Sequence, residues 1–383
     1  MTIFLTAALL LFAQNSSAQS DERIDRAQAS PLASFGQQLF FDANLSQHRT
    51  QACATCHDPA RAFTDGRAGP LAGAVSLGDD GESLGDRNTP TTGYVALTPE
   101  FQRDATGQFS GGFFADGRAS TLQRQVIGPM LDPIEMALPD TAAIVARVAE
   151  DPDHVSRMKS LFGDSVFAST EHATRAIAQA ITAFETSGFF APFDSKYDRY
   201  LRGDYTMTAD EELGRALFFS DLTNCAKCHL KHPNEVSDRE TFTNYRYHNI
   251  GIAINRAVRQ MNGLGSGYRD RGLASNPAVV GLHHNGKFKV PTLRNVAVTG
   301  PYMHNGIFAD LQTAVLYYGK FTVSSVASET NPETGERWGD PEFAQTIDFE
   351  LLRAGQPLSA DRARVIVAFL NTLTDARYEH LIE

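Results

Sequence analysis

The amino-acid sequence predicts a mainly α-helical protein made of two similar halves. A pentapeptide occurs twice, as Cys-Ala-Thr-Cys-His at residues 53–57 and as Cys-Ala-Lys-Cys-His at residues 225–229. Each copy follows a related hexapeptide, Gly-Gln-Gln-Leu-Phe-Phe at 36–41 and Gly-Arg-Ala-Leu-Phe-Phe at 214–219. Helical patterns of apolar residues flank both copies, whereas strand signals are short and sparse. We therefore expect two domains that arose by duplication.

Apolar residues with a helical period predict one long helix in each half. They are Ile177, Ile181 and Phe184 in the first half, and Ile366, Phe369, Leu370 and Leu373 in the second. Ser359 is expected to cap the second helix at its N-terminus, and Gly188 and Pro192 to end the first. We place the domain border near residue 190, with an N-terminal domain over 22–190 and a C-terminal domain over 191–383.

Each pentapeptide has the spacing of a covalent haem attachment site. The two thiols would form thioethers with the haem vinyl groups, and the adjoining histidine would ligate the iron. A redox dithiol or half of a zinc site also uses Cys-x-x-Cys, but neither requires the histidine that follows. The two motifs use all 4 cysteines of the chain. The sequence thus predicts two cytochrome c-like haem domains, with two haems c held by Cys53, Cys56, His57, Cys225, Cys228 and His229.

The N-terminal segment and the composition indicate an exported protein. Residues 3–12 are apolar but too few to span a bilayer, and Ser16-Ser17-Ala18 fits the pattern before a signal-peptidase cut. We expect residues 1–18 to be a signal peptide, the protein to be periplasmic, and no segment to span the membrane. The 45 acidic residues against 34 basic ones argue against nucleic acid as a partner.

Six further motifs resemble those of the di-haem bacterial cytochrome c peroxidase family, and most closely its MauG group. They are Asp-Arg-Asn-Thr-Pro at 86–90, Asp-Gly-Arg-Ala at 116–119, Pro-Ile-Glu-Met at 133–136, Phe-Asp-Ser-Lys-Tyr-Asp at 193–198, Val-Pro-Thr-Leu-Arg-Asn at 290–295, and Gly-Pro-Tyr-Met-His-Asn-Gly at 300–306. The resemblance covers essentially all of the mature chain. It implies an enzyme that uses hydrogen peroxide at the first haem and relays electrons through the second.

The resemblance assigns proton transfer at the first haem to Glu135, with Gln125 and Pro129 lining the same pocket. Cleavage of peroxide needs a group that moves a proton from the inner to the outer oxygen. The alternative for Glu135 is a solvated surface carboxylate, although its apolar setting favours a functional role. In related peroxidases a loop histidine blocks the first haem at rest. The matching stretch here, Ser-Leu-Gly-Asp-Asp-Gly at 76–81, holds no histidine, so we expect an open first haem.

Three side chains compete as sixth ligand of the second haem: Met261, Met303 and Tyr318. Methionine is the usual ligand in electron-transfer cytochromes. The segment 313–320 resembles the MauG segment that supplies an axial tyrosine, so we prefer Tyr318 over Met303. The alternative is that Tyr317 and Tyr318 are core aromatic residues.

The resemblance also implies a calcium ion between the haems. Asn88 and the backbone carbonyls of Thr299 and Pro301 match that site, and oxygen ligands suit this hard cation. The alternative for Asn88 is a turn residue.

The chain departs from the family at two tryptophan positions. Ala115 stands where the family has the tryptophan before Asp-Gly-Arg-Ala, and Thr223 stands where MauG has a second one; the only tryptophan is Trp338. These differences argue against long-range oxidation of a methylamine dehydrogenase precursor and leave a small cytochrome c or cupredoxin as the other partner. A different class stays open: a non-catalytic di-haem electron-transfer cytochrome, which would protect both irons and need no distal carboxylate.

Overall fold

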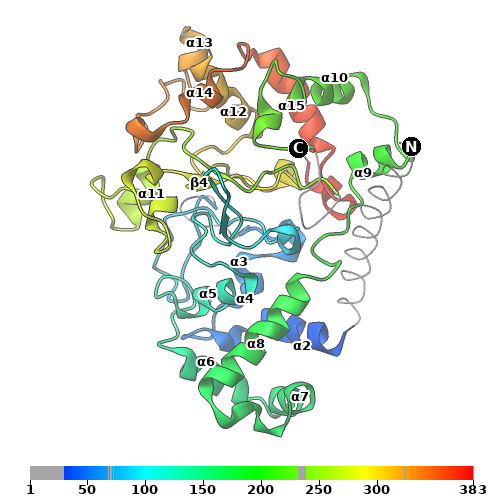
Figure 1. The fold of residues 1–383 in the computed structure, drawn as a ribbon, viewed down its shortest axis with the longest axis vertical. Coiled ribbons are helices and arrows are strands. Elements are labelled where there is room, and N and C mark those ends of the chain that lie inside the picture. The colour runs from blue at the N-terminus through cyan, green and yellow to red at the C-terminus, as the bar shows by residue number, and fades with distance from the viewer. Residues whose placement is uncertain are drawn as a thin grey trace, which may run out of the picture.

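The computed structural model describes residues 30–67, 69, 71, 73–231, 239–322 and 325–382. Helices dominate this part of the chain, which confirms the mainly α-helical prediction (Figure 1). Two small antiparallel sheets are present: β1 (Gln102–Arg103) pairs with β2 (Phe109–Ser110), and β3 (Tyr247–His248) pairs with β4 (Phe288–Lys289). The predicted signal peptide lies outside the described residues. None of the described helices has the length and apolar character that crossing a membrane requires.

The first half of the chain forms the lower part of the molecule in Figure 1, around the crossing of α2 and α8. Its helices are α2 (Pro31–Phe40), α3 (Cys53–Cys56), α4 (Leu122–Gln125), α5 (Gly128–Leu131), α6 (Thr141–Ala149), α7 (Pro152–Phe162) and α8 (Thr170–Glu185). The predicted apolar stripe of α8 is buried in one core with the apolar face of α2. Burial of that stripe confirms the helical pattern.

The second half forms the upper part of Figure 1, around α10 and α15. Its helices are α9 (Lys196–Leu201), α10 (Ala209–Phe218), α11 (Arg256–Met261), α12 (Leu311–Leu316), α13 (Val326–Glu329), α14 (Phe349–Leu352) and α15 (Ala360–Asn371). Ser359 caps α15 as predicted, because its hydroxyl accepts a hydrogen bond from the Arg362 N–H at 3.3 Å. Ile366, Phe369 and Leu370 are buried against α10.

A glycine brings the two principal helices of each half into close contact. A Cβ atom on Gly36 of α2 would lie 1.8 Å from the carbonyl oxygen of Ala180 in α8, and one on Gly214 of α10 would lie 1.8 Å from that of Val365 in α15. No side chain fits at either position, so the repeated hexapeptide encodes the same helix crossing twice. The origin of the halves by duplication stays a prediction.

Ion pairs join the two halves near the middle of the molecule. The Arg87 guanidinium donates to Asp116 at 2.7 Å within the first half and to both oxygens of Asp270 in the second half at 2.6 and 2.7 Å. The adjacent Asp86 pairs with Arg259 of α11. We call residues 86–88 the clasp, since consecutive side chains hold both halves.

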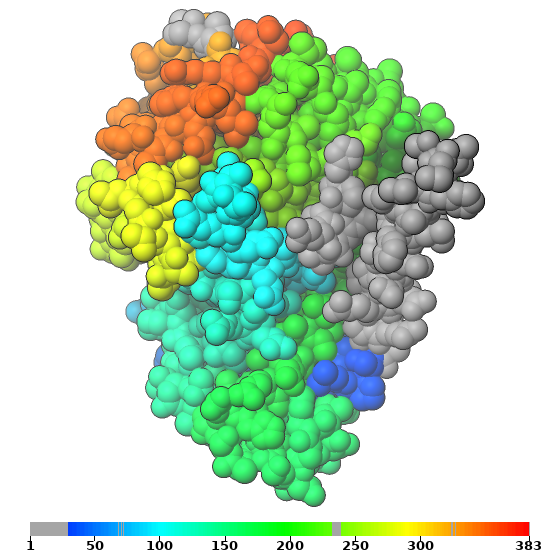
Figure 2. Space-filling model, viewed as in Figure 1, coloured from blue at the N-terminus to red at the C-terminus, as the bar shows by residue number. Residues whose placement is uncertain are grey.

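The β1–β2 hairpin of the first half also reaches onto the second half. Figure 2 shows this cyan segment against a yellow one. The centroids of the Phe109 and His284 rings are 5.3 Å apart. The Gly111 N–H donates to the Tyr245 carbonyl at 3.0 Å. The two halves therefore share backbone hydrogen bonds as well as side-chain contacts.

The C-terminal residues return to the first half. The Tyr94 phenol donates to Asp375, the Tyr378 phenol donates to the Pro59 carbonyl at 2.7 Å, and Arg377 donates to the Phe189 carbonyl at 2.6 Å. The predicted border near residue 190 falls between α8 and α9, but these returning contacts mean that the division into two domains stays a prediction.

The glycine contacts give a direct test of the fold. Replacing a helical glycine by alanine normally favours the helix by about 1 kcal/mol. Gly36→Ala and Gly214→Ala should instead each lower the free energy of unfolding by about 2 kcal/mol, because the added methyl group overpacks the crossing. Urea unfolding of the haem-containing protein measures this, with exposed Gln37→Ala on α2 as control. Stabilisation by Gly36→Ala would show that the helices are not in close contact.

Candidate di-haem site

The first Cys-x-x-Cys-His motif forms α3 and the residue that ends it. His57 caps α3, and its Nδ1 lies 3.1 Å from the carbonyl oxygen of Phe63. Arg67 lies on the other side of the motif, with its Nη2 3.3 Å from the Cys56 Sγ and 3.0 Å from the Leu77 carbonyl. The imidazole is thus oriented by the backbone, which leaves its Nε2 for a metal.

The second motif repeats this arrangement. Cys225 begins the short helix η5 (Cys225–Lys227), and the Nδ1 of His229 lies 2.8 Å from the Phe242 carbonyl. Burial lowers the pKa of His229 to about 4 and also lowers the pKa of His57. Both rings are therefore neutral at neutral pH, which is the form that binds a metal.

These residues fit covalently attached haem better than the competing uses of Cys-x-x-Cys. All four cysteines are free of disulfides. Burial raises the pKa of Cys56 to about 11 and that of Cys228 to about 12, whereas reactive dithiols and zinc thiolates need a lowered pKa. Within the described residues, no three His, Cys, Asp or Glu side chains cluster as a metal site. Cys53, Cys56 and His57 would hold one haem, and Cys225, Cys228 and His229 the other.

The loop at 76–81 connects the Glu135 segment to the first motif. Arg67, which is 3.3 Å from the Cys56 Sγ, donates to the Leu77 carbonyl, and the Asp79 N–H donates to the Glu135 carbonyl at 2.8 Å. The charge of Glu135 also raises the pKa of Cys56, by less than burial and Asp65 do. Burial, together with the charge of Asp132, raises the pKa of Glu135 to about 7, while Arg118 opposes the shift. A carboxyl group of that pKa both accepts and releases a proton near neutral pH, which is what acid–base catalysis requires.

Of the other predicted pocket residues, Pro129 lies next to the Glu135 segment and Gln125 lies on the adjoining helix. Gln125 ends α4 and Pro129 lies in α5, which contacts α4. The Pro129 carbonyl accepts a hydrogen bond from the Met136 N–H at 3.1 Å, so Glu135 and Pro129 lie on adjoining segments. The predicted roles of Gln125, Pro129 and Glu135 remain proposals.

Sequence reasoning missed the role of Arg118, whose charge acts on Glu135. The Arg118 guanidinium lies 3.6 Å from the centroid of the Phe114 ring, and it donates to Asp116 at 3.0 Å. The Phe114 ring in turn packs against Gly128 of α5. The motif Asp-Gly-Arg-Ala marked Arg118, but only folding brings it to the carboxyl group that it affects.

The loop at 76–81 is held in place through Asp79, which is buried. Its carboxylate accepts hydrogen bonds from the Ser46 hydroxyl at 2.7 Å, the Thr50 hydroxyl at 2.6 Å and the His48 N–H at 2.5 Å. Although burial opposes ionisation, these donors lower the pKa of Asp79 to about 2. The Asp79 N–H also donates to the Glu135 carbonyl at 2.8 Å, so the loop braces the Glu135 segment.

The two tyrosines of the second half differ in their surroundings. Tyr317 is a core residue, 2% exposed, whose hydroxyl bonds the Gly251 carbonyl and accepts from Lys320 at 2.8 Å. Tyr318 is 37% exposed, and thiolates at Cys228 or Cys225 would raise its pKa beyond the effect of burial. Tyr318 therefore lies at the second motif, with its hydroxyl unengaged by any residue that the structure describes.

The methionine candidates lie elsewhere. Met303 packs against the apolar cluster that contains Ile252, Phe308 and Tyr317, and Met261 is 47% exposed at the end of α11. These surroundings agree with the preference for Tyr318, whose role as an iron ligand remains a proposal.

Two residues of the predicted calcium site, Asn88 of the clasp and Pro301, both lie near Gly73. The Asn88 side-chain amide donates to the carbonyls of Gly73 and Ala74, at 3.2 Å each, and a Cβ on Gly73 would lie 3.7 Å from Pro301. The carbonyl oxygens of Thr299 and Pro301 accept no hydrogen bond from the described residues. They are available to a cation, and the calcium assignment stays a prediction.

The two positions that lack tryptophan are held by local contacts. The Ala115 carbonyl accepts a hydrogen bond from the Lys289 N–H at 2.9 Å, and the Thr223 hydroxyl donates to the Leu217 carbonyl at 2.7 Å. Neither side chain can be oxidised as an indole can.

Comparison with known proteins agrees with this site. The family described as di-haem cytochrome c peroxidase matches residues 30–206. Methylamine utilization protein MauG of Paracoccus denitrificans is 52% identical over 92% of this chain and 90% of its own. Cytochrome c551 peroxidase of Nitrosomonas europaea is 29% identical over 76% of this chain and 74% of its own.

Two solved structures of di-haem or MauG-like proteins are also similar to this chain. The diheme peroxidase BthA of Burkholderia thailandensis has a TM-score of 0.79 and 31% identity, covering 92% of this chain and 88% of that chain. A MauG-like protein associated with microbial copper homeostasis has a TM-score of 0.64 and 29% identity, covering 91% and 90%. With similarity over nearly the whole chain, this protein belongs to the MauG-type di-haem cytochrome c peroxidase family of oxidoreductases.

Proposed function

We propose that this protein is a periplasmic di-haem peroxidase that uses hydrogen peroxide at the first haem and relays electrons through the second to oxidise a redox partner protein. The observation that carries the proposal is the Glu135 carboxyl group, which has a pKa of about 7 and whose segment is hydrogen-bonded to the loop that also contacts Arg67 of the first haem site. A protein that only carried electrons would have no use for a proton-transfer group at that position.

Haem iron would supply the site that binds peroxide and accepts its oxidising power. His57 would hold the iron, with its ring fixed by the Phe63 carbonyl. The Glu135 carboxylate would accept one proton of the peroxide and return it to the oxygen that leaves as water. Arg118 opposes the rise in the Glu135 pKa and so keeps part of the population ionised near neutral pH.

An open first haem is supported by the hydrogen bonding of the loop at 76–81. The Asp79 carboxylate is fully used by Ser46, His48 and Thr50, and the Asp80 carboxylate accepts from Ser83 at 2.5 and 2.8 Å. Neither aspartate is free to ligate iron. We infer that peroxide reaches the first haem without prior reduction of the second.

At the second haem we propose Tyr318 as the ligand opposite His229. A phenolate stabilises the oxidised states of iron, which suits a centre that must hold an oxidising equivalent. We further propose that Ca²⁺ is bound by Asn88 with the Thr299 and Pro301 carbonyls. An exported, periplasmic location is consistent with c-type haem attachment and with the apolar N-terminal segment.

The proposed function leaves two candidate partner proteins. The 52% identity to a methylamine utilization protein favours a methylamine dehydrogenase precursor. Ala115 and Thr223 favour a small cytochrome c or cupredoxin, because no indole is available at either position to carry charge. We favour the small electron donor. The alternative function, electron transfer without catalysis, predicts two low-spin haems in the resting protein and no rapid reaction with peroxide.

Glu135→Gln tests the proposed activity. The variant should bind two haems per chain but react with peroxide about 10² to 10⁴ times more slowly, which is the usual contribution of acid–base assistance. In the parent protein, the rate should rise with pH through about 7, because the carboxylate is the active form. Stopped-flow absorbance with peroxide measures both effects. The exposed Glu82→Gln is the control, and equal rates in Glu135→Gln and the parent would reject Glu135 as the acid–base group.

Tyr318→Phe tests the ligand of the second haem. Loss of the phenol should change the low-spin electron paramagnetic resonance signal and the reduction potential of that haem. Tyr317→Phe is the matched control, since the Tyr317 hydroxyl is held by Gly251 and Lys320 and should not reach iron. A signal that changes only on replacement of Met303 would assign the ligand to methionine.

Ala115→Trp tests the choice between partners. The parent protein should lack persistent near-infrared absorption after peroxide and should mature a methylamine dehydrogenase precursor poorly, because no oxidisable ring lies at residue 115. The tryptophan variant should gain part of both properties. Near-infrared spectroscopy and an assay with the purified precursor are the measurements. Efficient maturation by the parent protein would mean that charge passes between the haems by another route.

A further inference from the structure

The only tryptophan of the chain lies two aromatic rings away from the second haem motif. Tyr318 lies within the electrostatic range of Cys228 and Cys225, and its ring centroid is 6.1 Å from that of Tyr317. The Tyr317 ring is in turn 5.2 Å from the Trp338 ring. Both ring pairs meet edge to face, at 81° and 87°. A continuous row of oxidisable side chains thus leads away from the second motif.

Trp338 forms the outer end of this row. Its ring is half-buried against Tyr317 and Phe308, while the residues before and after it, 332–337 and 339–340, are exposed. Its indole Nε1–H donates to the Ser328 carbonyl at 2.8 Å, which fixes the ring orientation. The row therefore connects the second motif to the protein surface.

Tyr317 and Trp338 would take part in electron transfer in different ways. Oxidation of a buried tyrosine requires its proton to leave, but the Tyr317 hydroxyl is bound to the Gly251 carbonyl, which is not a base, and receives a hydrogen bond from Lys320. Tyr317 would transmit an electron through its ring without being deprotonated. An indole can lose an electron while keeping its N–H, so Trp338 is the residue that can be oxidised in place.

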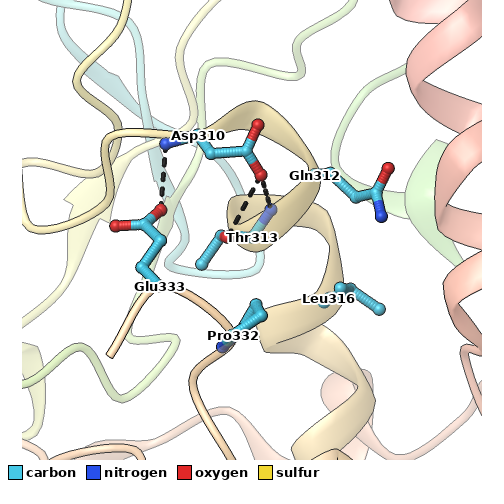
Figure 3. A pocket seen from close by; sticks show the side chains of 6 residues that line it. All are labelled: Asp310, Gln312, Thr313, Leu316, Pro332 and Glu333. Carbon is cyan, nitrogen blue, oxygen red and sulfur yellow. Dashed lines mark hydrogen bonds between the residues drawn. The ribbon is translucent and has the colours of Figure 1, made fainter. Parts of the chain in front are cut away.

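The surface around Trp338 is acidic. Residues 329–340 contain four acidic residues, Glu329, Glu333, Glu336 and Asp340, and one basic residue, Arg337, which pairs with Glu329 at 2.9 Å. From outside this segment, Lys320 lies within the electrostatic range of Asp340. Asp310 and Glu333 also line a pocket of about 260 Å³ that includes Leu316, the residue before Tyr317 (Figure 3). A partner that docks here would need a positively charged face.

We propose that Trp338 is the entry point at which a basic one-electron donor protein reduces the second haem, through the rings of Tyr317 and Tyr318. This inference rests on the proposed peroxidase function. Each H₂O₂ takes up two electrons and two protons to form two water molecules, and two donor molecules are each oxidised by one electron. Trp338 gives one electron inward and regains one from the donor in each transfer.

Replacement of Trp338 tests the electron entry. With mitochondrial cytochrome c as a basic donor, Trp338→Phe should lower turnover about tenfold while the stopped-flow reaction with peroxide is unchanged. Tyr317→Phe should keep the turnover, whereas Tyr317→Leu should lose it, because the ring and not the hydroxyl is needed. Phe321→Leu is the matched control, since its ring contacts Tyr317 at 5.8 Å but does not lie on the route to Trp338.

The acidic surface has its own test. The double variant Glu336→Gln/Asp340→Asn should raise the KM for the donor and weaken its dependence on ionic strength, with kcat unchanged. Asp153→Asn, on exposed α7 of the first half, is the control for a lost acidic charge. An unchanged KM in the double variant would place the docking surface elsewhere.

A readout independent of turnover comes from peroxide without donor. Peptide mass spectrometry should then find one or two oxygen atoms added at Trp338, and this modification should be lost in Tyr317→Leu. Normal peroxide consumption with an unmodified Trp338 and full turnover by Trp338→Phe would overturn the inference while leaving the peroxidase function standing. Absence of any peroxide consumption would instead reject the proposed function.

Discussion

The bridge made by Arg87 between Asp116 and Asp270 is the contact on which the arrangement of the two haem motifs depends. A buried ion pair contributes little net stability, because desolvation of the charges offsets their attraction, but removal of one partner leaves an uncompensated charge. Although burial opposes ionisation, the hydrogen bonds from Arg87 lower the pKa of Asp270 to about 2, so the bridge stays charged at neutral pH. The proposed electron transfer between the two haems would need a fixed distance, and a charged bridge with bidentate geometry allows few other docked positions of the halves.

The clasp also couples this bridge to the sites on either side. Next to Arg87, the Asn88 N–H donates to the His304 carbonyl at 2.8 Å, and His304 belongs to the same segment as Pro301 and Met303. The proposed calcium site therefore shares its backbone with the contact between the halves. A cation at Asn88 would stiffen the same stretch that Arg87 holds. The two haem motifs are built alike, with the Nδ1 of each histidine beside a backbone carbonyl, and under the proposed function Glu135 and Tyr318 would give the two haems different chemistry.

Features made by residues that are close in the sequence could be predicted, whereas contacts between residues that are distant in the sequence could not. The haem motifs, the apolar stripe of α8 and the Ser359 cap are local patterns, and the structure has the stripe and the cap where they were expected. Asp79 was expected only as one of two loop aspartates, because its hydrogen-bond donors at 46–50 are distant in sequence. No sequence pattern links Arg118 to Glu135 or Trp338 to Tyr317. These two relations can therefore be seen only in the folded structure. The proposal that Glu135 and Tyr318 are site residues rests on the family resemblance and on their surroundings in the structure.

Ala115 and Trp338 differ in whether they offer an aromatic ring through which an electron can move. Between the halves, the backbone of Ala115 is bonded to Lys289, and its methyl group offers no ring to an electron. On the outer side of the second motif, three aromatic rings lie in contact and the last one reaches the surface. Under the proposed function, oxidising power at the second haem would pass outward along these rings, whereas Ala115 offers no ring that would return it to the first haem. Such an arrangement suits an enzyme that consumes peroxide with electrons from a diffusible donor better than one that must hold two oxidising equivalents for a slow protein substrate.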